Sequence, residues 1–275
     1  MDKVKTNTIE NFHKVKKNIS ENTLKLFNNN TWWAKLIKAI IVVIIVIIVI
    51  YFIKLLFKKY KDYKNSKPWI LKGTKSAKKR MIILQDPSKN NAITLVRSKN
   101  EEKGLEFTYI FWMHINDWTV KYGEWKHVFH KGNESSWPLR APGVWLHPKE
   151  NTLRVYMNTF KDPSAHIDIP NIPINKWVCV TLAARHKNLD IYINGNVVKR
   201  KQFDSLIKQN YGDLYINSFQ GFGGYMSNIR YFDYYISYPE IQAHLNRGPS
   251  IVPCVDSNEM PPYLSDNWWA GQYDQ

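Results

Sequence analysis

The side chains of this sequence that are able to act as acids, bases or nucleophiles do not form a pattern typical of an enzyme. Retaining hydrolysis of a glycosidic bond needs two carboxylates about 5 Å apart, a spacing that acids at alternate positions of one strand provide. No two acids of the sequence are two residues apart, and the closest sets are Glu101-Glu102 and Asp256 with Glu259. The G-x-S-x-G, H-E-x-x-H and P-loop motifs are also absent from the sequence. We therefore expect no catalytic residues and no enzyme activity.

Tryptophan, asparagine and aspartate side chains in loop-like stretches are candidates for binding instead. Exposed tryptophans stack on sugar rings, and Asn and Asp bind hydroxyl groups or hold Ca²⁺ through their oxygens. The candidate ligand-binding residues are Asn116, Asp117, Trp118, Asn133, Trp137 and Asp162. The alternative for each Asn or Asp is a turn in which the side chain bonds to its own backbone. Three other tryptophans lie in strand-like runs and are expected in the core: Trp112, Trp145 and Trp177.

These candidates must be positioned by short β-rich runs that begin at Met81 and are separated by turn residues. The expected strands are 81–84, 93–97, 106–115, 124–130, 143–147, 152–159, 176–185, 188–193, 196–202, 213–217 and 224–233. Asn194-Gly195 between two of these runs is typical of a type I′ hairpin. The regular spacing predicts an antiparallel β-sandwich. One helix is expected from Tyr238, with Ser237 as its N-cap and Gly248-Pro249 as its stop.

Five motifs follow one another in the β-rich part of the chain. They are FTYIFW at 107–112, LRVYM at 153–157, INKWVCVTL at 174–182, LDIYING at 189–195 and GYMSNIRY at 224–231. Their order resembles the laminin-G/concanavalin A-like jelly roll, over residues 81–250. The resemblance implies an all-β antiparallel jelly-roll sandwich that binds sugars or proteins at a sheet face or loop rim. It also implies no cofactor, and calcium enters only through this analogy, because the sequence has no D-x-D-x-D-G loop.

The positive charge of the chain is concentrated beside one apolar segment. The formal net charge is +16, of which residues 1–38 carry +5, residues 54–80 carry +10 and residues 81–275 carry +1. Nucleic-acid binding is therefore not expected, because the β-rich part that would carry a specific function is almost neutral. The expected acidic partners of residues 54–80 are anionic lipid headgroups, which attract basic clusters beside a membrane.

Residues 36–57 are expected to form a single transmembrane helix. The run AIIVVIIVIIVIYFI at 39–53 has no charged residue and no Gly or Pro. As a helix, Leu36 to Phe57 spans about 33 Å, enough to cross a hydrocarbon core of about 30 Å. The membrane-anchor residues expected at its ends are Trp32, Trp33, Lys38, Tyr51 and Lys54.

The lysines on the two sides of the span predict its orientation. Three lysines lie in the window before the span and eight in the window after it. Cytosolic flanks are richer in Lys and Arg, so the C-terminal domain is expected on the cytosolic side. Two glycosylation sequons, at Asn18 and Asn133, make the orientation testable. Cys179 and Cys254 are able to pair only in an oxidising compartment, and the sequence leaves their pairing open.

Three further segments complete the expected domain organisation. Residues 1–35 form a basic N-terminal tail, either an amphipathic helix on the bilayer or a disordered segment. Residues 58–80 form a polybasic linker in which Pro68 and Gly73 interrupt any helix. Residues 251–275 form an acidic, aromatic tail with Trp268-Trp269, which either packs along the domain or docks another protein.

The anchor, together with a composition rich in Lys, Asn and Ile, resembles laminin-G-like membrane proteins of large nucleocytoplasmic DNA viruses. The resemblance implies a non-enzymatic structural protein in a virion or host internal membrane, associated with the capsid. Such a protein binds other proteins through its sandwich. The alternative is a surface lectin that binds glycans for attachment.

Overall fold

The computed structural model describes residues 31–98 and 104–254. The chain divides into two compact units, Met1–Asp62 and Tyr63–Gln275. The sequence-based interpretations of residues 1–30 and of 255–275 lie outside the described residues.

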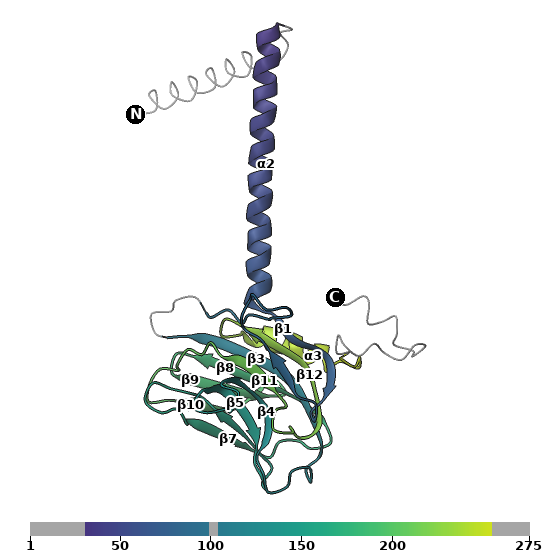
Figure 1. The fold of residues 1–275 in the computed structure, drawn as a ribbon, viewed down its shortest axis with the longest axis vertical. Coiled ribbons are helices and arrows are strands. Elements are labelled where there is room, and N and C mark those ends of the chain that lie inside the picture. Colours follow the sequence, from purple (N-terminus) through teal and green to yellow (C-terminus); the bar gives the residue numbers. More distant parts are fainter. Residues whose placement is uncertain (1–30, 99–103, 255–275) are drawn as a thin grey trace, which may run out of the picture. The chain divides into compact units, whose positions relative to one another are not determined.

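A single long helix, α2 (Trp32–Ser66), accounts for the apolar segment (Figure 1). It extends beyond 36–57 on both sides, because the flanking lysines and tyrosines continue a helix readily, and it ends two residues before Pro68. All five predicted anchor residues lie on it. By length and composition α2 is able to cross a membrane, and a signal sequence near an N-terminus meets the same criteria.

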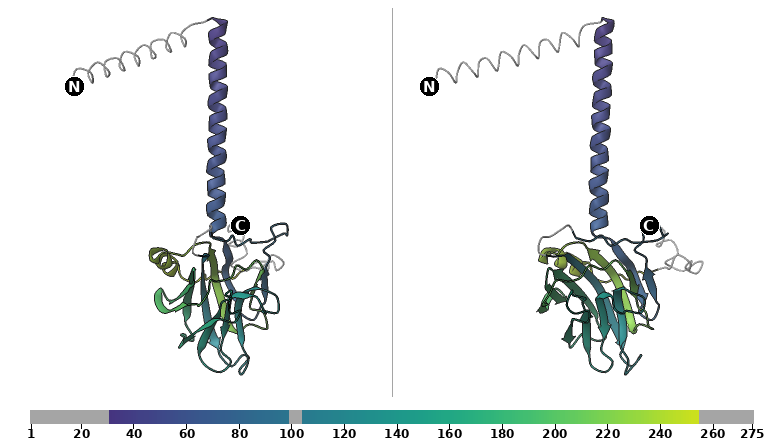
Figure 2. Two further views of the ribbon diagram at one scale, coloured as in Figure 1. Left: turned by 90° about the vertical axis from the view of Figure 1, so that its left-hand side faces the viewer. Right: turned by 60° about the vertical axis from the view of Figure 1, so that its left-hand side comes forward.

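The second unit contains two antiparallel sheets of six strands each, as the sequence predicts. The first sheet has the order β1 (Trp69–Ser76), β12 (Gly223–Phe232), β3 (Glu106–Asp117), β8 (Trp177–Arg185), β9 (Asn188–Ile193) and β10 (Asn196–Gln202). The second sheet has the order β2 (Met81–Ile83), β11 (Asp213–Ile216), β4 (Lys126–Gly132), β5 (Arg140–Leu146), β6 (Thr152–Tyr156) and β7 (His166–Pro170). Figure 2 shows the two sheets packed as layers of a sandwich.

The core lies between the sheets and follows the period-two pattern of the strands. Phe111 of β3 packs edge-on against Phe129 of β4, with ring centroids 5.1 Å apart, and both are fully buried. On β6, Leu153 and Val155 are fully buried, whereas the residues that alternate with them are partly exposed. The outward positions of the second sheet therefore carry the polar side chains that are available for function.

Helix α3 (Tyr238–Arg247) covers part of the outer face of the first sheet. Ile241 of this helix packs in a second apolar cluster with Trp112 and Cys179 of the sheet. The helix begins with a capping box between Ser237 and Glu240, so the predicted N-cap is confirmed. Trp112 is buried as predicted, and burial raises the pKa of the Cys179 thiol to about 12. Cys179 and Cys254 are not joined by a disulfide.

Three local predictions differ from the structure. Strand β1 lies inside the segment expected to be a linker, so the sandwich begins at Trp69 rather than at Met81. Strand β7 was not expected. Residues 93–97 do not form the expected strand, because the side chain of Gln85 takes the place of a neighbouring strand. Its Nε2 donates to the carbonyl of Ile93 at 3.0 Å, and its Oε1 accepts from the N–H of Leu95 at 3.0 Å.

Two exposed sheet edges are occupied by other parts of the chain. Along β7, the carbonyl of Asp168 accepts from Lys199 Nζ at 3.0 Å and the carbonyl of His166 accepts from Lys201 Nζ at 2.6 Å. Along β1, the N–H of Thr74 donates to the carbonyl of Val252 at 2.8 Å. The backbone groups at these positions are therefore already used within the unit.

Candidate functional site

Side chains that point away from the core form a continuous row across five strands of the second sheet. The strand register places Tyr215 opposite His130, and His127 opposite Trp145. It also places Trp145 opposite Arg154, and Arg154 opposite Asp168. We call this row and the side chains flanking it the outer strip: Trp125, His127, His130, Trp137, Arg140, Trp145, Arg154, Tyr156, Asp168 and Tyr215.

Arg154 and Asp168 form a complete ion pair on the outer strip. The Nε of Arg154 donates to Oδ1 of Asp168 at 2.6 Å, and Nη2 donates to Oδ2 at 2.7 Å. These hydrogen bonds lower the pKa of Asp168. The guanidinium group also lies 4.8 Å from the ring centroid of Trp125. Because both carboxylate oxygens are held by Arg154, Asp168 is ionised and unsuited to donate a proton as a general acid.

Arg140 lies beside this pair, and within residues 31–98 and 104–254 it forms no ion pair with a carboxylate. Its guanidinium carbon is 3.6 Å from the ring centroid of Tyr156 and 5.5 Å from that of Trp137. Its Nε is buried and, among the described residues, has no hydrogen-bond partner. Burial lowers the pKa of Arg140, and the nearby Arg154 acts in the same direction. The planar N–H donors of a guanidinium group match the geometry of a carboxylate.

Asn158 holds together the two loops that present Trp137 and Asp162. Its Nδ2 donates to the carbonyls of Pro138 at 2.9 Å and Pro163 at 2.6 Å. Its Oδ1 accepts from the N–H of Arg140 at 2.7 Å. Trp137 is 52% exposed beside Arg140, whereas Asp162 caps its own loop by accepting from the N–H of Ser164. Of these two predicted residues, Trp137 is therefore the one that lies on the outer strip.

The other predicted candidates lie elsewhere. Asn116 and Asp117 end strand β3 of the first sheet rather than lying in a loop. Asp117 accepts from both the N–H and the hydroxyl of Thr119, which lowers its pKa. Trp118 is half-buried against the core, with Lys126 Nζ 5.0 Å from its ring centroid. Asn133 donates to the carbonyl of Trp137 at 3.1 Å. The contacts of Asp117 and Asn133 are hydrogen bonds to nearby backbone groups, which is the alternative to ligand binding given in the sequence analysis.

A buried histidine pair continues the outer strip toward β11. His127 Nε2 and His130 Nδ1 are 2.7 Å apart, and His130 Nε2 is 2.7 Å from the carbonyl oxygen of Asn133. Because that carbonyl only accepts, His130 carries its proton on Nε2 and His127 donates to His130 Nδ1. Burial lowers the pKa of both histidines, so both are neutral at pH 7. The His130 ring stacks on Tyr215 with centroids 5.0 Å apart.

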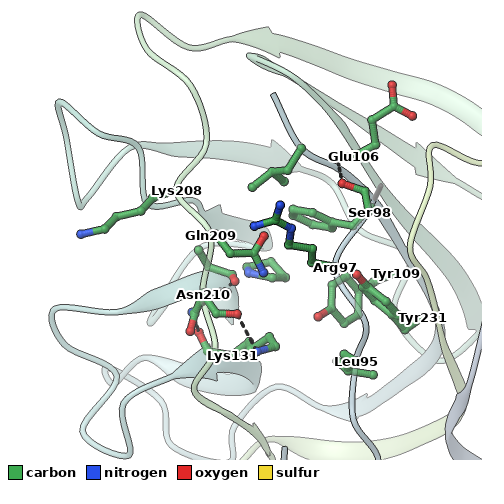
Figure 3. Close-up of a pocket in the computed structure, with 14 residues that line it drawn as sticks. Leu95, Arg97, Ser98, Glu106, Tyr109, Lys131, Lys208, Gln209, Asn210 and Tyr231 are labelled. Carbon is green, nitrogen blue, oxygen red and sulfur yellow. Dashed lines mark hydrogen bonds between the residues drawn. The ribbon is translucent and has the colours of Figure 1, made fainter. Parts of the chain in front are cut away.

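A small pocket lies between residues 95–98 and the loop at 208–210 (Figure 3). Its cavity volume is about 30 Å³, and its lining includes Lys131, Tyr109 and Tyr231. The Nζ of Lys131 donates to the carbonyls of Asn210 and Gly212, each at 2.8 Å. Burial lowers the pKa of Lys131 to about 8. These hydrogen bonds join the loop that contains Asn210 and Gly212 to β4, which indicates a structural role for Lys131.

The described residues contain no group of three or more His, Cys, Asp or Glu side chains placed to hold a metal ion. Calcium therefore stays an expectation from the family resemblance alone. The outer strip presents aromatic faces and guanidinium groups, which are side chains suited to recognition.

Most residues of the outer strip escaped the sequence analysis. Arg154 and Tyr156 had a readable signal, because they alternate with Leu153 and Val155 in the motif LRVYM. Trp145 was expected in the core and is indeed 8% exposed, but it faces outward on β5 while Val144 and Leu146 point into the core. Strand register, which brings these positions into one row, was not available from the sequence.

The solved structures similar to this chain include binding domains that belong to toxins, and the similarity is low. The receptor binding domain of botulinum neurotoxin D is 12% identical, with a TM-score of 0.46, over 67% of this chain and 53% of that chain. The binding domain of Paraclostridial Mosquitocidal Protein 1 is also 12% identical, with a TM-score of 0.45, over 66% and 46%. The binding domain of botulinum neurotoxin serotype C1 is 18% identical, with a TM-score of 0.41, over 52% and 36%. This chain therefore spans about half or less of the proteins it matches.

The search of curated proteins finds no match. The family model described as the concanavalin A-like lectin/glucanases superfamily, of laminin-G type, matches residues 87–242, which is more than half of the chain. That region contains ten of the twelve strands of the described residues in full, β3 to β12. The chain belongs to the concanavalin A-like lectin/glucanases superfamily.

Proposed function

We propose that this chain is a membrane-anchored, non-enzymatic module that binds an acidic segment of another protein on its outer strip. The observation that carries the proposal is Arg140, whose buried Nε has no partner among the described residues while two aromatic rings flank the guanidinium group. Trp, Tyr and Arg are the residues that dominate binding energy at protein interfaces. The outer strip contains all three residue types. Arg140 is the residue that would bind an acidic group of the partner.

The setting we propose follows the charge distribution of the chain. Helix α2 is the anchor, the lysines around its end bind anionic headgroups, and the sandwich lies on the cytosolic side of a virion or host internal membrane. A structural protein that links a viral membrane to capsid or neighbouring proteins is the role that suits this arrangement. The alternative partner is an acidic glycan, which would require the opposite orientation.

The test uses the full chain in nanodiscs of uncharged phosphatidylcholine, panned against a library of 12-residue peptides. We expect enriched peptides to combine Asp or Glu with Trp or Tyr. Arg140→Gln should weaken their binding by about thirtyfold, the loss typical of a hot-spot residue. Lys187→Gln is the matched control, because it removes one positive charge from an exposed turn between β8 and β9.

Three outcomes overturn the proposal. The first is a set of enriched peptides without acidic residues, and the second is an equal loss of binding in the Arg140 and Lys187 variants. The third is Arg140-dependent binding of hyaluronan or chondroitin sulfate in place of peptides, which would establish the glycan alternative. Neutral dextran serves as the polysaccharide control, since it offers rings without a charge.

A further inference from the structure

One exposed phenylalanine, Phe219, rests on three rings of the outer strip. Its ring stacks on Trp145, with centroids 5.6 Å apart and an interplanar angle of 26°. It is also nearly parallel to His130 at 6.3 Å and edge-on to His127 at 5.5 Å. Nevertheless 43% of Phe219 is exposed, so this side chain covers the strip from outside instead of belonging to the core.

The loop that carries Phe219 has an unusual backbone. Phe219 has φ of 51°, Asn217 has φ of 51° and Gln220 has φ of 65°, and Gly221 follows with φ of 57°. The left-handed region disfavours residues with a Cβ, and a bulky side chain most of all. The loop is held by Lys121, whose Nζ donates to the carbonyl of Phe219 at 2.7 Å. A strained conformation retained at an exposed position points to a functional constraint.

The rings beneath Phe219 and the loop beside it carry polar atoms that are left without partners. Among the described residues, these buried atoms are Trp145 Nε1, His127 Nδ1, Ser218 Oγ, and both side-chain polar atoms of Asn217. Buried polar groups normally have hydrogen-bond partners, and each one without a partner destabilises the structure. A phenyl ring fills space over this cluster but forms no conventional hydrogen bond with it.

The histidine tautomers specify what kind of group is missing. His130 uses its proton on the carbonyl of Asn133, and His127 donates its Nε2 proton to His130 Nδ1. The Nδ1 of neutral His127 is therefore an acceptor, and the group that would complete it is a donor. An aromatic ring that bears an N–H or O–H group satisfies both the stacking surface and this acceptor.

We propose that Trp145, His127 and His130 form a ring-binding subsite that Phe219 occupies, and that a Trp or Tyr side chain of the protein partner displaces Phe219 from it. This inference deepens the proposed function, on which it rests, by naming an aromatic donor as the second determinant beside the acid that Arg140 binds. Phe219 acts as an internal competitor, since the partner's ring must take the place of its ring.

The test measures binding of indole and of 1-methylindole to the full chain in nanodiscs by saturation-transfer NMR. Phe219→Ala should bind indole at least about tenfold more tightly than the unsubstituted chain, because competition for the subsite is removed. The gain should be absent for 1-methylindole, which has the same ring shape but no N–H donor. Tyr225→Ala, which removes an aromatic side chain of equal exposure, 43%, from the first sheet, should show no gain.

Equal binding of indole to the Phe219 variant and the unsubstituted chain would overturn the inference, and so would an equal gain for indole and 1-methylindole. Adding Trp145→Ala to Phe219→Ala should abolish the gain, and its retention would place indole elsewhere. The outcome is separate from that of the proposed function, because these probes carry no acid and do not depend on Arg140. Acidic peptides that bind through Arg140, with no indole effect, would leave the proposed function standing alone.

Discussion

Arg154 and Asp168 neutralise each other through two parallel hydrogen bonds, of 2.6 and 2.7 Å, on adjacent strands β6 and β7. Arg140 lies over the same Tyr156 ring that Arg154 approaches at 5.8 Å. Two guanidinium groups thus lie near one aromatic ring, and one of them is paired with a carboxylate of the strip. The charge that this surface offers to a ligand is the charge of Arg140.

Asp168→Asn is expected to convert Arg154 into a second anion site. Binding of the acidic peptides selected on this chain should tighten by about threefold, a modest gain for a partly exposed charge. The free energy of unfolding should fall by about 1 kcal/mol or less, because both partners are partly exposed to solvent. Titration of the peptide and urea unfolding measure the two effects. Weaker peptide binding in this variant would contradict an anionic ligand.

Asn158→Ala is expected to release the two loops that Asn158 joins. The side chain is 1% exposed and makes three hydrogen bonds to backbone groups. Their loss should cost about 3 kcal/mol of unfolding free energy, at about 1 kcal/mol for each bond. Peptide binding should weaken as well, because Trp137 and Arg140 lose their support. The control is Asn246→Ala, which changes an exposed residue of α3. An equal loss of unfolding free energy in this control would show that the effect is not specific to Asn158.

Acidification should destabilise the sandwich between about pH 6.5 and pH 4, the window set by the histidines. Burial lowers the pKa of His127 and His130, and it lowers the pKa of His244 to about 4. In this window the unfolded chain binds protons that the folded chain does not, so stability falls as the pH falls. The melting temperature measured across this range tests the expectation. His244→Gln should flatten the profile in part, and an unchanged profile would exclude His244 as a contributor.

At alkaline pH the stability should continue to rise with pH, because of Lys131. Burial holds the pKa of Lys131 at about 8, below its ordinary value of 10.5. Between these values the unfolded chain keeps a proton that the folded chain has released, so stability should rise from pH 8 toward pH 9.5. The slope is at most about 1.4 kcal/mol per pH unit for one group. Urea unfolding at each pH measures it, and Lys131→Met should remove it.

Glycosylation reports the orientation of the anchor. We expect translation into microsomes to give no glycan at Asn133, because the lysines after the span favour a cytosolic sandwich. The sequon at Asn18 should then be modified. A glycosidase-sensitive shift that disappears in Asn133→Gln would reverse the orientation and would favour the glycan-binding alternative.

The sequence predicted the parts of the fold that depend on local patterns. The hairpin of β9 and β10 has the predicted bounds, and Asn194 and Gly195 adopt the positive φ values, 49° and 80°, that its turn requires. Strand β1 was missed because its lysines and Gly73 read as a linker. They are tolerated there because β1 is an edge strand of the sheet.

The candidate site was less accessible from sequence, for a physical reason. Trp137 was recognised because it lies in a polar loop, where a large aromatic is conspicuous. The contact of Arg140 with Tyr156 depends on how β5 and β6 align, and the stacking of Phe219 on Trp145 joins a loop to a distant strand. Neither contact can be recognised from a pattern of neighbouring residues in the sequence. The outward polarity of β6 was visible, but its neighbours across the sheet were not.

The two lysines of β10 that bind the carbonyls of β7 affect how neighbouring copies of the sandwich are able to pair. Proteins tethered to a bilayer are concentrated in two dimensions, where open strand edges recruit one another into ribbons. Lys199 and Lys201 occupy the carbonyl acceptors of β7 that such a neighbour would need. On β1, an edge strand of the first sheet, the carbonyl of Val252 accepts from the N–H of Thr74. Copies of this sandwich should therefore not pair through β7 or through this part of β1 at high surface density. Their encounters with other molecules would then be decided by side chains on the faces instead of by backbone pairing.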